Sequence, residues 1–571
     1  MTRSKLRMGG PCVFAMGLLL LCVLPLLAED TSSPRPTLNQ ASAFGVSAPL
    51  SELASQPQPP PFGFHEANPV RRIPKQTFER VTDPVEQRIV APAAEFSLIN
   101  HGFGVGHGFP NYTVPDAPPD TNMAVGDTQI IQWVNVSYTI CNKDLSGCSA
   151  AILGNSLWVS GLPGSLCAQD NDGDILAQWD RAAHRWVLSQ NVFRSPYAVC
   201  IAISQTPNAM GAWNVYQFPV PGNGFPDYPK MGIWSTGGAS DGYFEAVNNF
   251  GPQAQRFMGP QICGYHRAKL LAGDRTAEQI CFQLTASEDS LLPADVDSPA
   301  SPPSDEDEFF IGSVADVDTS HLSLYSMHIN NWATGSATMT GSPNTQLIAV
   351  APYNGSCSGS FGGACVPQRG TGDRVDSLGD RLMYRFAYWK DSNPGPIPCS
   401  TCQSQPFFQH WFVNGDVESS TGQIGVRWYE LKDQVTTVTA AHLAATTPAN
   451  QGTYIGVPGD ANYRWMGSLT RDKMGNILLG YSESSSTMYP SIAVAGRFPS
   501  DPVNTLSPEV FAVNGTGSQA DTSNRWGDYS AMRVDPSDNC TFYYTTEYYL
   551  VPADTFDWST DISRWKFSNC H

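Results

Sequence analysis

The stretch "NRWGDYSAMRVDPSDNCTFYYTTEYY" (residues 524–549) has the pattern of a strand, a tight turn and a second strand, opened by an arginine and an aspartate. The stretch "NYRWMGSLTRDKMGNILLGYSES" (462–484) has nearly the same order of residue types. Apolar runs bounded by Gly, Asn and Asp turns are typical of antiparallel strands. A pattern that recurs within one chain predicts a repeat architecture, in which each unit buries its faces against its neighbours.

A turn residue, an aspartate and an apolar strand recur in this order from residue 116 onward. Clear copies begin at Asp120, Asp174, Asp227, Asp380 and Asp528, and looser copies at Asp307 and Arg464. The starts are about 50 or more residues apart, and each unit holds several strand-like runs, which is typical of propeller blades. We therefore predict an all-β fold, a β-propeller of about seven four-stranded blades. Six blades are the alternative, because the copy at Asp307 is loose.

Two further segments bear on how such a ring is built. The run "WSTDISRWKF" (558–567), near the end of the chain, is expected to lie beside the first blade and so close the ring. The run "YHRAKLLAG" (265–273) is the only short helical candidate in the chain. Strands therefore dominate the expected fold.

The N-terminal part of the chain differs in composition from the repeats. Residues 1–28 combine early Arg and Lys with the apolar run "VFAMGLLLLCVLPLLA", the pattern of a secretory signal peptide cleaved after Ala28. Residues 29–110 are rich in Pro, Ser, Gln and Gly and are predicted to be a disordered leader. Residues 111–571 would then be the propeller domain. We expect a secreted protein, extracellular or periplasmic, with no membrane partner after signal cleavage.

Cysteine usage agrees with export. Of the 14 cysteines, all but two follow the signal peptide, and an even number in an oxidising compartment is expected to pair. Sequence order does not prove connectivity, but it suggests a set of short-range disulfides that would staple hairpins or blades. The suggested pairs are Cys141–Cys148, Cys167–Cys200, Cys263–Cys281, Cys357–Cys365, Cys399–Cys402 and Cys540–Cys570. The "CSTC" at Cys399 could instead be a redox motif, but no βαβ pattern surrounds it.

The charge balance excludes one class of partner. The chain has 33 Lys and Arg against 52 Asp and Glu, a net charge of −19. Such a chain repels polyanions. We expect neither nucleic acid nor an anionic membrane surface as a partner.

Residues that begin the innermost strands of a propeller should surround one mouth of its central channel. We predict Asp174 and Asp528 as general acid and base there, since glycoside hydrolysis needs a pair of carboxylates. Arginines bind carboxylates and sulfates through a planar fork, so Arg381, Arg464 and Arg525 are predicted to bind substrate. Asp380, next to Arg381, is the fourth predicted substrate-binding residue. The alternative is structural: a repeated Asp caps its own turn, and the arginines form salt bridges.

"DNDGD" (170–174) has the alternating carboxylates of a calcium loop. Calcium is the ion that Asp170, Asp172 and Asp174 would bind. The loop departs from the EF-hand pattern, with Ile175 where glycine is needed and Arg181 where the last glutamate belongs. A solvated turn is the alternative, and we expect no other cofactor.

Several motifs resemble those of known proteins. "PPDTNMAVG", "RWMGS", "SSSTMYPSI" and "RWGDYSAMRVDPSDNCTFYYTTEYY" resemble a group of uncharacterised secreted bacterial β-propeller proteins over about residues 115–570. More distantly, the blades are similar to sialidase and BNR-repeat propellers, in which an arginine triad binds a substrate carboxylate and Asp, Glu and Tyr do the chemistry. "TRDKMGNI" at Thr470 departs from the Asp-box of those enzymes, with an extra residue and no aromatic. No residue role is carried over.

These observations give a hypothesis of function with alternatives. The first is a secreted propeller that recognises or hydrolyses an extracellular carbohydrate, an anionic one included, at the channel mouth. As an enzyme it would be a glycoside hydrolase of sialidase-like architecture. The alternatives are a non-catalytic binding or cell-surface interaction propeller, and a structural exported protein without a ligand. We expect a monomer.

Overall fold

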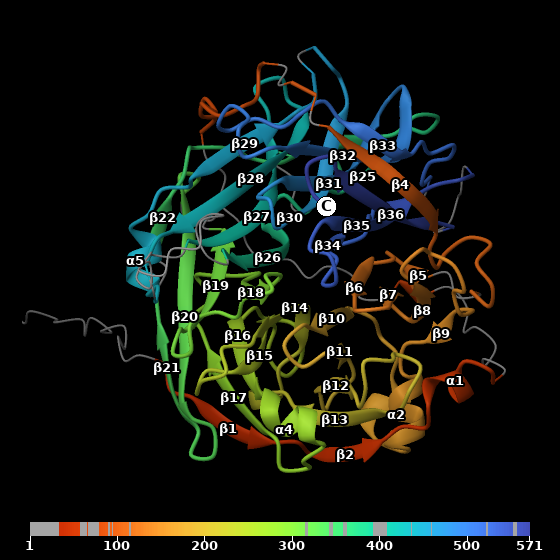
Figure 1. The fold of residues 1–571 in the computed structure, drawn as a ribbon, viewed down its shortest axis with the longest axis vertical. Coiled ribbons are helices and arrows are strands. Elements are labelled where there is room, and N and C mark those ends of the chain that lie inside the picture. The colour runs from red at the N-terminus through yellow and green to blue at the C-terminus, as the bar shows by residue number, and fades with distance from the viewer. Residues whose placement is uncertain are drawn as a thin grey trace, which may run out of the picture. The chain divides into compact units, whose positions relative to one another are not determined.

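One strand from each repeat lies in a ring around a central axis, as the computed structural model shows (Figure 1). The structure describes residues 34–56, 65–66, 73, 79–89, 92–93, 95–112, 116–313, 318–341, 346–357, 363–391, 408–435, 437–457, 459–520, 524–551 and 557–571. The ring strands are β6 (Asn122–Val125), β10 (Leu176–Asp180), β14 (Pro226–Trp234), β18 (Leu292–Val296), β26 (Leu382–Lys390), β30 (Tyr463–Arg471) and β34 (Ala531–Val534). Each contacts the next, and β34 contacts β6, so the ring closes.

A mostly antiparallel sheet extends outward from each ring strand. The first three sheets contain β7 (Gln129–Val134), β8 (Ser137–Asn142) and β9 (Ile152–Leu153); β11 (Arg185–Val192), β12 (Ala198–Ser204) and β13 (Trp213–Pro219); and β15 (Gly242–Asn249), β16 (Gly259–His266) and β17 (Glu278–Gln283). The next two contain β19 (Glu308–Ser313), β20 (His321–Asn331), β21 (Ser336–Thr340) and β22 (Leu347–Ala349); and β27 (Gln409–Glu418), β28 (Ile424–Asp433), β29 (Asn450–Tyr454) and β23 (Asn354–Gly355). The predicted all-β propeller class is confirmed.

The last two sheets complete the ring. One contains β31 (Ile477–Ser485), β32 (Met488–Arg497) and β33 (Val510–Val513), and the other contains β35 (Thr541–Tyr548), β36 (Ser559–Phe567) and β4 (Phe96–Phe103). As expected, the run near the end of the chain lies beside the first blade, because Gln132 of β7 donates to Thr560 of β36 at 2.8 Å. The described residues contain no helix with the length and apolar character to span a membrane.

Short elements connect or cover these sheets. The helices are α1 (Leu50–Leu53), α2 (Ser156–Gly161), α3 (Leu166–Gln169), the 3₁₀ turn η1 (Pro221–Asn223), α4 (Arg267–Ala272) and α5 (Ala440–Ala444). Helix α4 forms where the sequence predicted its one helix. Two small two-stranded sheets pair β24 (Val366–Pro367) with β25 (Arg374–Val375), and β3 (His65–Glu66) with β5 (Asp116–Ala117).

The core lies between the blades. All seven residues of β12 are buried, because neighbouring structure covers both faces of the strand. A strand covered on both faces is a continuous apolar run without alternation, as "AVCIAIS" shows. Large aromatic side chains such as Trp186, Trp213 and Trp465 fill the inter-blade space and are fully buried. Blade stacking therefore supplies the apolar burial that one sheet alone lacks.

Four segments of the expected disordered leader form strands, the short β3 among them, and one forms helix α1. β1 (Thr37–Gln40) pairs with β17, β2 (Ala43–Val46) pairs with β13, and β4 is the outermost strand of the last blade. The expectation of disorder is therefore wrong for these segments. They contribute edge strands, whose backbone hydrogen bonds need no strong apolar pattern. The predicted signal peptide lies outside the described residues.

One repeat start is also corrected. Asp307 precedes β19, the second strand of its blade, and the ring strand of that blade is β18. The run "LPADV" of β18 is short and has no Gly or Pro turn with an aspartate directly before it. β18 pairs in parallel with β26, at Asp295 and Ala387, which joins two blades into one sheet.

Five of the suggested disulfides are present. They are Cys141–Cys148, Cys167–Cys200, Cys263–Cys281, Cys357–Cys365 and Cys540–Cys570. Cys399 and Cys402, with the "CSTC" motif, lie outside the described residues. Local pairing is thus correct for every pair that the structure describes.

Candidate functional site

The predicted aspartates do meet at the starts of the ring strands, which we call the entry mouth. The backbone N–H of Asp528 donates to Asp120 Oδ1 at 2.7 Å, and Arg525 Nη2 lies 3.1 Å from Asp528 Oδ1. Asp120 also interacts electrostatically with Asp174. The structure therefore brings Asp174, Asp528 and Arg525 into one charged cluster, as the repeat pattern predicted.

A lysine and two tyrosines complete this cluster, and the sequence reasoning missed them. Lys230 Nζ lies 3.2 Å from the ring centroid of Tyr228 and 3.7 Å from that of Tyr529. Arg381 stacks over the Tyr228 ring at 4.6 Å, and its Nε donates to Asp380 Oδ1 at 2.8 Å. Cations over aromatic faces are stabilised by the ring quadrupole. The cluster thus holds its cations between rings and carboxylates.

Burial shifts the pKa values of this cluster. Burial, followed by the nearby Asp528 and Asp174, raises the pKa of Asp120 well above its usual value. Burial also raises the pKa of Asp376 to about 7 and that of Glu547 well above its usual value, while it lowers the pKa of Lys230. Groups that hold protons near neutral pH are therefore gathered at this mouth.

Some of these carboxylates also link neighbouring blades. Asp174 Oδ2 accepts the backbone N–H of Tyr228 at 3.0 Å, at the start of the next ring strand. The contact between Asp120 and Asp528 links the last blade to the first in the same way. Asp120 and Asp174 have positive φ values of 46° and 48°, a conformation that Asp tolerates in tight turns. The structural interpretation of the repeated aspartates accounts for these contacts.

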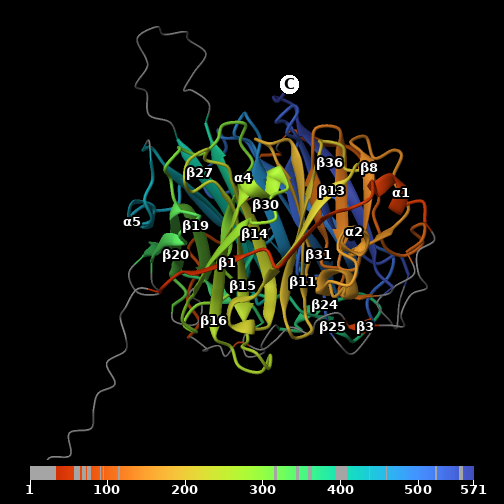
Figure 2. The same ribbon diagram turned by 90° about the horizontal axis from the view of Figure 1, so that it is seen from below.

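An apolar layer contacts the entry mouth. Val366 of β24 and Val375 of β25 belong to one buried cluster with Tyr228 and Tyr529. Figure 2 shows β24 and β25 at one end of the ring and the C-terminus at the other. Arg381 is only 3% exposed, so a ligand could reach its guanidinium only if covering residues moved.

Arg464 belongs to a different cluster from Arg381 and Arg525. Its Nη2 lies 2.5 Å from Asp460 Oδ2, 2.9 Å from Glu483 Oε1 and 2.7 Å from Glu509 Oε1. Among the described residues, these three carboxylates are the one group close enough together to suit a metal ion. The guanidinium nitrogen already lies between them, so they serve as its counter-ions.

The "DNDGD" carboxylates have separate partners. Asp170 pairs with Arg194 at 3.1 Å, and Asp172 Oδ2 accepts the N–H of Phe193 at 2.9 Å. Asp174 faces the entry mouth. These three residues are not among the carboxylates that the described residues bring together as a metal-sized group. Asp174 is buried, so the solvated-turn alternative does not describe it, and calcium binding stays a prediction.

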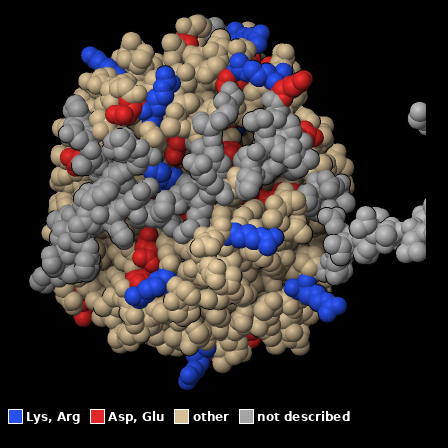
Figure 3. Space-filling model, turned by 180° about the vertical axis from the view of Figure 1, so that it is seen from behind, with Lys and Arg blue, Asp and Glu red and all other residues tan. Residues whose placement is uncertain are grey.

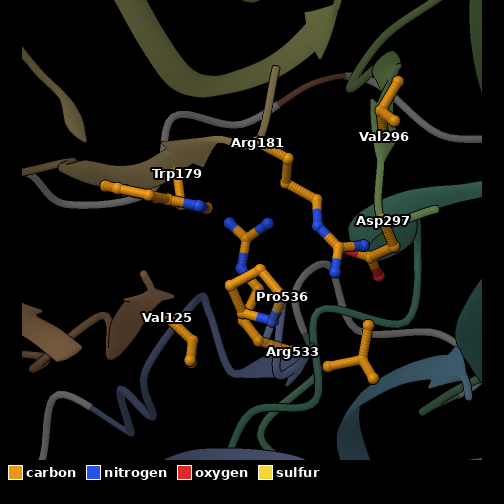
Figure 4. A pocket seen from close by; sticks show the side chains of 8 residues that line it. Val125, Trp179, Arg181, Val296, Asp297, Arg533 and Pro536 are labelled. Atoms are coloured by element: carbon orange, nitrogen blue, oxygen red, sulfur yellow. The ribbon is translucent and has the colours of Figure 1, made fainter. Parts of the chain in front are cut away.

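The other ends of the ring strands, which we call the exit mouth, carry a pocket. Trp179, Arg181, Asp297 and Arg533 line it, from β10, the turn after β10, the end of β18, and β34 (Figure 4). The hollow is small, with room for about one water molecule. Its walls combine an aromatic ring with charged side chains, the kinds of group that position a small polar ligand.

Ion pairs form the floor of this pocket. Arg533 Nη1 donates to Asp295 Oδ2 at 2.6 Å, and Arg385 donates to the same Oδ2 through Nε at 2.9 Å. Arg385 also binds Asp297 through Nη1 and Nη2, at 2.6 Å and 2.8 Å. These buried pairs fix the guanidinium planes below the pocket.

The sequence carried a signal for the exit mouth. Several of the repeated strand segments end on an aspartate as well as beginning after one. They are "AQWD" at Asp180, "ADVD" at Asp297 and "MRVD" at Asp535. A second recurring carboxylate, one strand length after the first, points to the opposite mouth of the channel. The arginines Arg181, Arg385 and Arg533 have no such repeat, and their convergence depends on the closed ring.

Comparison with known proteins leaves the family open. No protein-family model matches the chain, and no curated protein matches it. Among solved structures, the chain is similar to the WD40 domain of SCAP from fission yeast, at 8% identity, 83% of this chain, 98% of that chain and a TM-score of 0.33. It is also similar to the α-L-arabinofuranosidase Arb93A from Fusarium graminearum, at 9% identity, over 82% of this chain and 99% of that chain, with a TM-score of 0.34. A third similar structure is the phage phi92 endosialidase, at 10% identity, over 82% of this chain and 69% of that chain, with a TM-score of 0.33.

Proposed function

We propose that this protein is an exported β-propeller that recognises carbohydrate at a mouth of its central channel. The observation that carries the proposal is the exit-mouth pocket, in which an indole and two guanidinium groups face one hollow on the axis. Aromatic rings offer an apolar face with a polar edge, and arginines offer several directed donors. A polyhydroxylated ligand uses both kinds of contact.

Disulfides support the extracellular or periplasmic location. The five pairs in the described part of the chain need an oxidising compartment to persist. The signal peptide with cleavage after Ala28, the monomeric state and membership of the secreted bacterial propeller group stay predictions. On the face seen in Figure 3, the visible Lys and Arg side chains are interspersed with Asp and Glu, which is unfavourable for a polyanion such as nucleic acid.

Hydrolysis is the second candidate function, at the entry mouth. Asp174 and Asp528 would be its acid and base, with Arg381, Arg464, Arg525 and Asp380 as predicted binding residues. The observation in its favour is the gathering of Asp120, Asp174 and Asp528 in one cluster, beside Asp376 with its pKa raised to about 7. Arg464 lies in a different cluster from the other predicted arginines, and apolar side chains contact the entry mouth. Both observations favour carbohydrate binding over hydrolysis.

A glycan screen with two variants tests both candidates. The mature protein is incubated with neutral and acidic oligosaccharides, and both retention and product release are measured. Binding that Trp179→Ala abolishes and Asp528→Asn retains supports recognition at the exit mouth. Turnover that only Asp528→Asn abolishes supports hydrolysis at the entry mouth. Arg185→Gln, on the same hairpin as Trp179, is the control, and absence of any binding would refute the proposal.

A further inference from the structure

Two buried donors that face the exit-mouth pocket have no acceptor in the described part of the chain. The indole Nε1 of Trp179 and the Nη1 of Arg181 are inaccessible to solvent and make no hydrogen bond among the described residues. Trp179 is only 6% exposed, so it is more than nine-tenths buried. An unmatched buried donor destabilises the fold, more so when it is charged, so two at one place call for an external acceptor.

The geometry directs these donors to the same place. Trp179 is the penultimate residue of β10, and Arg181 directly follows the strand. Figure 4 shows the indole nitrogen turned into the pocket beside the Arg533 guanidinium. The Trp179 ring is fixed by edge-to-face contact with Trp186, with centroids 4.7 Å apart. Arg181 is held from the other side by a hydrogen bond from its Nη2 to Asn539. Both donors are therefore positioned before any ligand binds.

Charged side chains of both signs surround the pocket. Arg385 and Arg533 share the carboxylates of Asp295 and Asp297. Among the ion pairs of the described residues, none includes Arg181, although Asp297, Asp535 and Asp127 interact with its charge over a longer distance. Burial lowers the pKa of Arg181 to about 10, and it outweighs the raising effect of Asp297, Asp535 and Asp127.

We propose that Trp179 and Arg181 bind an oxyanion in this pocket, such as the carboxylate of an acidic sugar or a sulfate group. One oxygen accepts from the indole N–H and another from Arg181 Nη1–H, above the ion pairs of Arg533 and Arg385. Charge-assisted bonds of this kind are the strong ones. The inference deepens the proposed carbohydrate function, because it names the group on the ligand that the pocket selects.

Calorimetric titration of the mature protein tests the inference with three probes: inorganic sulfate, glucuronate and glucose. We expect sulfate and glucuronate to bind and glucose to bind far more weakly. Arg181→Gln and Trp179→Phe should each weaken anion binding by at least about tenfold, since each removes one donor to a charged group. Trp179→Phe keeps an aromatic ring, and Arg185→Gln on the same hairpin should leave affinity unchanged. Circular dichroism verifies that each variant is folded.

The outcomes separate this inference from the proposed function. Sulfate or glucuronate binding that both pocket variants weaken supports the oxyanion site, even if no oligosaccharide binds in the glycan screen. Acidic oligosaccharides that bind equally well to Arg181→Gln would support carbohydrate recognition and overturn the oxyanion site. No anion binding by the wild-type protein, or binding that neither variant changes, would also overturn it.

Discussion

Arg385 and Asp297 form a two-point ion pair next to the channel, with Nη1 2.6 Å from Oδ2 and Nη2 2.8 Å from Oδ1. Arg385 lies on β26 and Asp297 directly follows β18, so the pair joins two neighbouring blades. Burial raises the pKa of Asp297, but the Arg385 guanidinium outweighs this effect and holds that pKa below its usual value. The pair is thus charged and buried at neutral pH.

Removing one partner of this pair should be costly. Asp297→Asn leaves the Arg385 charge short of a counter-ion, and we expect the free energy of unfolding to fall by about 3–5 kcal/mol. Urea unfolding followed by fluorescence measures the change. Asp144→Asn, at an exposed turn, is the control and should change stability by less than about 0.5 kcal/mol. A loss for Asp297→Asn as small as that of the control would contradict a structural role for the pair.

Removal of Arg464 should turn the carboxylates around it into a calcium site. Arg464→Ala removes the cation between Asp460, Glu483 and Glu509, whose candidate ligand atoms lie within 4.8 Å of one another. Oxygen ligands of this number and charge suit Ca²⁺, so millimolar calcium should raise the melting temperature of the variant. The wild-type protein should show no such response from this cluster, because Arg464 Nη2 occupies its centre. Equal responses in both proteins would disprove this account.

A buried glutamate predicts a pH dependence of stability. Burial raises the pKa of Glu245 from 4.5 to about 7, against a hydrogen bond from Tyr265 that lowers it. A carboxyl group whose pKa is higher in the folded state stabilises the fold at low pH, and this contribution is lost as the pH rises through about 7. Glu245→Gln should therefore flatten the decline of stability between about pH 5 and pH 7, by at most about 1.4 kcal/mol per pH unit.

Urea midpoints at several pH values check the Glu245 prediction. Gln retains an oxygen that accepts from Tyr265, so packing and hydrogen bonding are nearly preserved. Curves for the wild type and the variant that stay parallel across this range would show that Glu245 does not titrate there.

Local chemistry explains what the sequence could predict. Aspartates that begin ring strands, such as Asp174 and Asp528, were found because the same turn recurs in each blade. Short-range disulfides such as Cys141–Cys148 were found because neighbouring cysteines meet across one hairpin. Both features depend on contacts within one blade or between adjacent blades, which a local pattern records.

Features that depend on ring closure were missed for a physical reason. Arg533 reaches Asp295 from a strand more than two hundred positions away in the chain, and no local pattern specifies that distance. The β4 sequence "FSLINHGF" does not alternate strictly between apolar and polar residues, so it gave no strand signal within a Pro- and Gly-rich segment. Sequence position also could not show that the predicted arginines lie in two clusters. Arg464 and Arg525 precede or begin ring strands of adjacent blades, but different carboxylates surround them in the closed ring.

Two disulfides predict a difference in stability that follows from loop length. Cys167–Cys200 closes a separation of 33 residues, and Cys141–Cys148 closes a separation of 7. In the chain-entropy model the longer loop contributes about 4 kcal/mol and the shorter about 2.5 kcal/mol. Alanine replacement of both cysteines should thus cost more for the first pair, as measured by urea unfolding. A larger loss for Cys141→Ala/Cys148→Ala would reject the loop-length explanation.

Strand β4 closes the last blade, and Phe96 is its main apolar contact. The Phe96 ring lies 5.3 Å from that of Phe567 and 6.0 Å from that of Trp565, both on β36. Because Phe96 is only partly buried, Phe96→Ala should cost about 2–3 kcal/mol, near the lower end for a phenylalanine truncation. Phe103 at the other end of the strand is 64% exposed, so Phe103→Ala is the matched control and should have little effect.

Hydrogen exchange of the last blade distinguishes closure by β4 from simple surface packing. If β4 closes the ring, Phe96→Ala should speed amide exchange in β36, whose outer edge pairs with β4 from Phe96 to Phe103. The effect should also reach β34 and β6, because the last and first blades meet there. Faster exchange confined to β4 itself would show that the ring holds without this strand.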